Sequence, residues 1–68
     1  MTIEVTINGR PTALDKPMTV QEFLDLKKLH RNMVVVEHNG TILKRPQFDE
    51  ITINSGDTLE VVHFVGGG

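Results

Sequence analysis

The sequence contains no cysteine, tryptophan or tyrosine, and it has a single serine. Without cysteine the chain has no disulfide framework and no thiolate zinc site. The histidines, His30, His38 and His63, do not lie at the spacing of metal ligands on one helical face, so we expect no metal site. The serine, Ser55, lies in a run of turn-forming residues and is a poor candidate for an activated nucleophile. These absences disfavour an enzyme that relies on its own side chains.

Charge and hydropathy exclude two further classes. The formal net charge is -2 and no block of basic residues is present, so nothing indicates nucleic-acid binding. No apolar run approaches the ~18 residues of a membrane span, and residues 1–4 lack the basic and apolar segments of a secretory signal. We therefore expect a cytoplasmic protein with no nucleic-acid or membrane partner. A chain of 68 residues is one small domain, with little material for a deep active-site cleft.

The chain opens with the pattern of a β-hairpin. Residues 2–7 alternate between apolar and polar side chains, which is typical of a half-buried strand. Asn8-Gly9 follows at once, and this dipeptide favours a two-residue type I′ turn because both positions need positive φ. Such a short loop determines the register of the two strands. The expected pairs are Val5 with Thr12 and Ile3 with Leu14.

A short helix follows the hairpin. Thr19 and Glu22 have the spacing of a capping box, in which each side chain bonds to the backbone amide of the other residue. The apolar residues that we expect on one stripe of this helix are Val20, Phe23, Leu24 and Leu26. We expect roughly ten residues of helix, which need a sheet to pack on.

Three more strands complete the expected sheet. Residues 33–36 are an apolar run that suits an interior strand with both faces partly covered. Asn39-Gly40 then predicts a turn into residues 41–43, and Phe48 is expected to plug one end of the core. The last strand covers residues 58–64, with Leu59 and Val61 pointing inward. The order β-β-α-β-β-β, with one helix packed across a mixed sheet, is an α+β roll.

The last strand runs into three glycines, Gly66, Gly67 and Gly68. Glycine loses much conformational entropy on ordering and adds no side chain to a core. We therefore expect a folded domain over residues 1–65 and a flexible tail over residues 66–68. From Val65 onward the chain reaches ~13 Å at most, enough to thread the Gly68 carboxylate into another protein's active site.

A free carboxylate is a poor electrophile, so a partner would first activate it with ATP as an acyl-adenylate. If the chain carries sulfur, a C-terminal thiocarboxylate is the available form, because its own side chains offer no thiol.

Motifs along the whole chain are shared with a known family. They are the Asn8-Gly9 turn, residues 19–24, residues 35–40, residues 56–62 and the closing residues 63–68. In these segments the chain resembles the sulfur carriers of thiamine biosynthesis, the ThiS family, and the closing segment is the most specific. Relatives often have Val-Pro-Arg where this chain has Leu43-Lys44-Arg45-Pro46, a departure that affects only the shape of one loop.

The resemblance implies a ubiquitin-like β-grasp fold and a carrier that is not itself an enzyme. It implies that an E1-like, ThiF-type enzyme adenylates Gly68 with ATP and Mg, and that a sulfur donor relay then forms the thiocarboxylate. Val65, Gly66 and Gly67 would thread the end of the chain into partners. The sulfur would go to a ThiG-type thiazole synthase for the thiazole ring. The carrier itself would bind no cofactor.

The last strand also predicts where a partner docks. The adjacent valines Val61 and Val62 break strict alternation, so one side of the strand shows apolar surface near the tail. We predict that Val62 and Phe64 form part of a docking patch; packing of Phe64 under a neighbouring loop is the alternative. Other functions stay open: a carrier for molybdopterin synthesis, a protein modifier joined through Gly68, or an interaction module with an inert tail.

Overall fold

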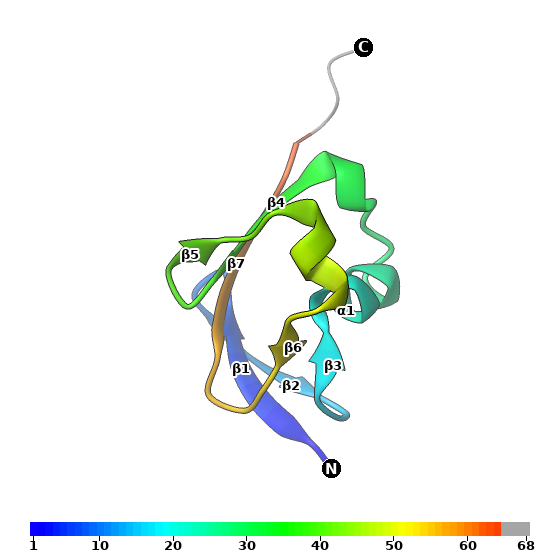
Figure 1. Cartoon of the computed structure of the whole chain (residues 1–68). Helices are drawn as coiled ribbons and strands as arrows, with labels where there is room; N and C mark the ends of the chain where they lie inside the picture. The colour runs from blue at the N-terminus through cyan, green and yellow to red at the C-terminus, as the bar shows by residue number, and fades with distance from the viewer. Residues whose placement is uncertain (65–68) are drawn as a thin grey trace.

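The computed structural model describes residues 1–64 of the chain (Figure 1). The strands are β1 (Ile3–Ile7), β2 (Arg10–Leu14), β3 (Met18–Thr19), β4 (Val34–His38), β5 (Thr41–Ile42), β6 (Thr52–Ile53) and β7 (Thr58–His63). One α-helix, α1 (Val20–Leu26), and two 3₁₀ helices, η1 (Arg31–Met33) and η2 (Arg45–Asp49), lie between them. Val65 and residues 66–68 lie outside the described residues, so the predicted domain boundary and tail stay predictions.

Five strands form one mixed sheet in the order β2-β1-β7-β4-β5. The pair β1·β7 is parallel, whereas β1·β2, β4·β7 and β4·β5 are antiparallel. The helix α1 and the turn η2 lie on the same side of this sheet (Figure 1). The predicted α+β order β-β-α-β-β-β is confirmed for the five-stranded sheet. The sequence patterns did not predict β3, which pairs with β6 in a separate two-stranded sheet.

The predicted hairpin register is confirmed. Ile3 lies opposite Leu14, and Val5 lies opposite Thr12. Asn8 and Gly9 both have positive φ, 51° and 79°, as a type I′ turn requires. A two-residue turn allows only one register of the two strands. A slip of one residue would also move Ile3 and Val5 out of the core.

The capping box of α1 is confirmed, but the helix is shorter than expected. The Glu22 amide donates to Thr19 Oγ1 at 3.1 Å, and the Thr19 amide donates to Glu22 Oε1 at 2.8 Å. The helix has seven residues because Lys28 takes the left-handed conformation, with φ 59°. The Leu29 amide then bonds to the Leu24 carbonyl at 2.8 Å, which closes the helix with a Schellman motif.

The prediction for Leu26 is wrong. The side chain is 60% exposed, whereas Val20, Phe23 and Leu24 are buried. Leu26 lies two residues after Leu24, about 200° further round the helix. It therefore points away from the sheet that the other three residues contact.

The core lies between the sheet and the elements on its one covered face. Phe48 is buried as predicted, brought there by η2, which the sequence patterns did not predict. Leu59 is buried and Val61 partly buried, as expected for the inward side of β7. Residues 34–38 form an interior strand, as expected, because β4 lies between β7 and β5. Val34 and Val36 are buried on the side of α1 and η2, whereas Val35 on the opposite face is only partly covered, with 39% of its surface exposed. Within residues 1–64 no helix is long and apolar enough to cross a membrane.

Candidate functional site

The central strand β7 carries the chain toward the predicted attachment residue. It lies between β1 and β4 and runs to the end of the molecule where the described chain stops (Figure 1). The Phe64 amide donates to the Met33 carbonyl at 3.0 Å, which extends the ladder one residue past the strand. The predicted attachment site, Gly68, and the predicted threading residues Val65, Gly66 and Gly67 lie outside the described residues. We call Phe64 the tail root, since it comes directly before Val65 and the three closing glycines in the sequence.

Asn8 ties the first hairpin to β7. Its Nδ2 donates to the Val61 carbonyl at 3.1 Å, and its Oδ1 accepts from the Val61 amide at 2.7 Å. The Asn8 backbone amide also donates to the Leu59 carbonyl at 2.9 Å. The amide side chain thus pairs with β7 as the next residue of a neighbouring strand would. Asn-Gly identified the turn, but nothing local indicated this contact across 53 residues.

Asn39, in the second Asn-Gly turn, contacts the other edge of β7. Its Oδ1 accepts from the Thr58 amide at 2.8 Å, and its backbone amide donates to the Thr58 carbonyl at 2.8 Å. Its φ is 49°. Both Asn-Gly turns therefore hold β7 by backbone and side-chain hydrogen bonds. These bonds fix the position of the strand that leads to the C-terminal residues.

Arg31 and Arg45 join the two 3₁₀ turns beside the tail root. Arg31 Nη2 donates to the Arg45 carbonyl at 2.9 Å, and Arg45 Nε donates to the Arg31 carbonyl at 3.1 Å. Arg45 Nη2 also donates to the Asn32 carbonyl at 3.2 Å. Because Met33 follows Asn32 and accepts from Phe64, this arginine pair supports the segment against which β7 ends. A loop arginine gives no sequence signal for such a contact.

His38 and Asp57 form a polar cluster at the opposite end of β7. His38 Nε2 lies 2.8 Å from Asp57 Oδ2. Asp57 also accepts from the Asn54 amide at 2.9 Å and from Asn39 Nδ2 at 3.3 Å. Burial disfavours the charged carboxyl, but the hydrogen bonds from Asn54, His38 and Asn39 outweigh it and hold the pKa of Asp57 below its ordinary value. The cluster supports the turns that flank β7.

The other two histidines have local roles or none. His30 Nδ1 accepts from the Asn32 amide at 3.1 Å and caps η1, whereas His63 is exposed on β7. In the part of the chain that the structure describes, no three histidine, aspartate or glutamate side chains are grouped so as to hold a metal ion.

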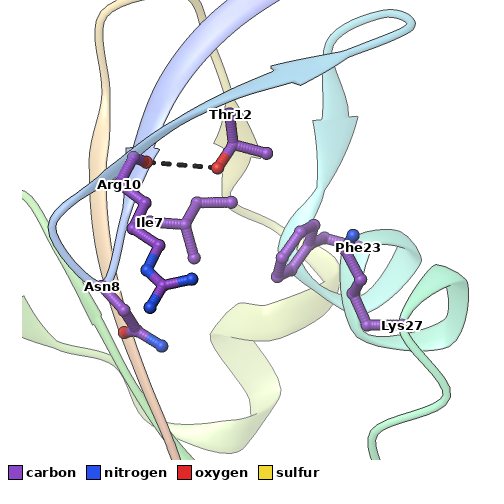
Figure 2. Close-up of a pocket in the computed structure, with 6 residues that line it drawn as sticks. All are labelled: Ile7, Asn8, Arg10, Thr12, Phe23 and Lys27. Atoms are coloured by element: carbon purple, nitrogen blue, oxygen red, sulfur yellow. Dashed lines mark hydrogen bonds between the residues drawn. The ribbon is translucent and has the colours of Figure 1, made fainter.

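An open groove of about 410 Å³ lies between the first hairpin and α1 (Figure 2). Its lining residues are Ile7, Asn8, Arg10, Thr12, Phe23 and Lys27. The charged groups in it are Arg10 and Lys27, which lie on opposite walls (Figure 2). The lining contains no carboxylate or imidazole, so it offers no general base.

The predicted docking residues lie together on the uncovered face of the sheet, which we call the outer face. Strand alternation places Val62 and Phe64 on the same side, and the sequence reasoning missed two apolar neighbours, Val35 opposite Val62 and Ile42 on β5. The exposed fractions are 58% for Val62, 42% for Phe64, 39% for Val35 and 65% for Ile42. Phe64 is thus exposed rather than buried under a loop. The docking role of Val62 and Phe64 stays a prediction.

Comparison with known proteins identifies the family. The family model described as ThiS family matches residues 5–68. The chain belongs to the ThiS family of sulfur carrier proteins. A ThiS relative, the sulfur carrier protein ThiS of Bacillus subtilis, is 35% identical over 63 residues, covering 91% of this chain and 96% of that protein.

A solved ThiS structure has the same fold. The crystal structure of the thiamine biosynthesis protein ThiS from Geobacter metallireducens matches with a TM-score of 0.82 and 38% identity. It covers 97% of this chain and 100% of that one. The predicted β-grasp fold and the predicted role, a ThiS sulfur carrier for thiamine biosynthesis, are confirmed.

A longer relative contains a ThiS-like region. The thiazole synthase of Paramagnetospirillum magneticum is 33% identical over 66 residues, which are 97% of this chain but 20% of that protein. The thiazole synthase of that organism therefore contains a ThiS-like segment within its own chain.

Proposed function

We propose that this ThiS-family protein carries sulfur as a thiocarboxylate on Gly68 and acts as a co-substrate of partner enzymes. The observation that carries the proposal is the extent of the family match, which runs to residue 68 and so includes all three closing glycines. Glycine lacks a Cβ, so its acyl carbon can pass a narrow channel and stay open to attack. The carrier holds no cofactor of its own in this scheme; ATP and Mg belong to the activating partner.

The proposed chemistry has two steps on the adenylating enzyme, an E1-like protein of the ThiF type. A Gly68 carboxylate oxygen attacks the α-phosphorus of ATP, and pyrophosphate leaves as the acyl-adenylate forms. Hydrosulfide from a sulfur donor then attacks the acyl carbon. The C–O bond to AMP breaks as the C–S bond forms, and loss of the thioacid proton leaves the thiocarboxylate. The adenylation step consumes ATP, which the cytoplasm supplies, so we propose that the protein acts in the cytoplasm.

The proposed acceptor is a thiazole synthase of the ThiG type. Support comes from thiazole synthases that contain a ThiS-like region, including a second one, from Magnetococcus marinus, at 29% identity. Tethering two proteins in one chain raises their effective concentration, which is useful when one must deliver a group to the other. Val65, Gly66 and Gly67 would then span the distance between the docked body and the active site of the enzyme.

The proposed docking patch of Val62 and Phe64 lies beside this tail. Apolar side chains that are exposed on a monomer commonly anchor protein partners. The position of both residues at the end of β7 means that docking there leaves the following residues free to enter a partner's active site.

Intact-mass measurement tests the proposal. The full chain is incubated with the adenylating enzyme from the same genome, ATP, magnesium and sulfide. We expect a mass gain equal to exchanging one oxygen for one sulfur, and no gain without ATP or after deletion of Gly68. A chain that keeps its mass, with an enzyme that is active on another ThiS carrier, would refute the proposed chemistry.

A further inference from the structure

The outer face of the sheet combines exposed apolar side chains with negative charges. Strand alternation places Glu4 of β1, Glu37 of β4 and Glu60 of β7 on this face. Arg10 is the one lysine or arginine in the five strands. It lies opposite Ile7 and so on the covered side, which leaves the outer face of the strands without a basic residue. The face is therefore negative, and the Arg10–Lys27 groove on the covered side is positive (Figure 2).

Two of these glutamates lie directly opposite each other. Glu37 pairs with Glu60 in the β4·β7 register, which brings their Cβ atoms to ~4.5–5.5 Å. Like charges in this position destabilise a sheet. Within residues 1–64 the ion pairs are Arg31–Asp49 and His38–Asp57, so neither Glu37 nor Glu60 has a cationic partner there.

The glutamate pair borders the apolar residues described above. Val35 and Val62 form the next pair along β4 and β7, and Ile42 lies opposite Glu37 on β5. We define the outer-face patch as Val35, Ile42, Val62, Glu37 and Glu60. A basic side chain from another protein would meet two carboxylates here while its neighbours cover apolar surface, and it would relieve the repulsion between the carboxylates.

We infer that the outer-face patch binds the thiazole synthase, which presents an arginine or lysine side chain between Glu37 and Glu60 beside an apolar surface. This inference rests on the proposed function for the identity of the partner. The thiazole synthases with a ThiS-like region favour that enzyme as the occupant. The charged residues of the patch are both glutamates, so the thiazole synthase must present a positively charged side chain to them. In the free carrier the repulsion between Glu37 and Glu60 lowers the stability of the sheet. Binding of the basic side chain would relieve this repulsion.

Paired charge variants of the full chain test the inference by titration calorimetry against the thiazole synthase from the same genome. The double variant Glu37→Gln/Glu60→Gln is expected to bind about tenfold more weakly at low salt, a change of ~1.4 kcal/mol. The difference should shrink at ~1 M salt, where the screening length is ~3 Å. Glu60→Lys, which opposes the expected basic group, should weaken binding further. The single variants Glu37→Gln and Glu60→Gln are compared with Glu4→Gln, which also removes one charge from the same face but away from the patch.

Stability separates a binding effect from misfolding. Because the double variant removes a repulsion, its urea midpoint should equal or exceed that of the unchanged chain. Binding that falls no more in Glu37→Gln and Glu60→Gln than in Glu4→Gln, or a urea midpoint that falls in parallel with binding, would overturn the inference. An effect on the adenylating enzyme but not on the thiazole synthase would overturn the assigned occupant. Thiocarboxylation of the unchanged chain is measured separately by mass, so failure of the carrier chemistry is distinguishable from failure of this surface.

Discussion

Replacing Asn8 tests how the first hairpin holds the strand that leads to the tail. Asn8→Gly keeps the positive φ that the turn requires but removes both side-chain hydrogen bonds to Val61, which measure 3.1 and 2.7 Å. A hydrogen bond contributes ~0.5–1.5 kcal/mol net, and both groups are exposed to water. We therefore expect the free energy of unfolding to fall by ~1–2 kcal/mol.

Two further variants separate the conformational effect from the hydrogen bonds. Asn8→Asp keeps an oxygen that accepts from the Val61 amide but has no donor for the Val61 carbonyl, so it should lose about half as much as Asn8→Gly. Asn8→Ala loses both bonds and adds the ~1–2 kcal/mol cost of a left-handed residue with a Cβ. The expected order of stability is therefore unchanged chain, Asp, Gly, Ala.

Urea denaturation with an unchanged slope gives these free energies. For a domain of this size a loss of ~1 kcal/mol lowers the melting temperature by ~4–8 °C, so thermal melting provides a second measure. Hydrogen exchange at the Val61 amide should also accelerate in the Gly variant. The reasoning would be refuted if Asn8→Gly matched the unchanged chain while Asn8→Ala were much less stable, since only the backbone conformation would then matter.

Two further predictions concern the ends of β7. The folded-state pKa of Asp57 is lowered from its ordinary 3.8, so its ionisation stabilises the fold above pH ~4 and this contribution disappears as the pH falls through the folded value. Urea titrations should therefore show Asp57→Asn less stable than the unchanged chain near neutral pH, with the gap closing in acid; a gap that stays constant with pH would mean that ionisation plays no part. Phe64→Ser removes an exposed side chain at the tail root, so we expect partner binding to weaken about tenfold or more with a loss of stability below ~1 kcal/mol. Intact binding in a calorimetric titration together with a collapse of thermal stability would show instead that Phe64 is a packing residue.

The sequence by itself determined the features that depend on neighbours within a few residues. The Asn8-Gly9 turn set the register of β1 and β2, because a two-residue loop admits one pairing. The Thr19–Glu22 capping box marked the start of α1, since both partners lie within one helical turn. The closing motifs indicated the family, which the match over residues 5–68 confirmed.

Tertiary structure decided the features that join distant segments. Asn8 contacts Val61 and Arg45 contacts Arg31 through hydrogen bonds whose partners are 53 and 14 residues apart. Such contacts arise from how the elements pack, and no local pattern encodes them. The same reason explains the exposed side of β4: an apolar run looks alike whether one face or two are covered. Only the position of α1 and η2 on one side of the sheet left Val35 exposed beside Val62, with Glu37 facing Glu60.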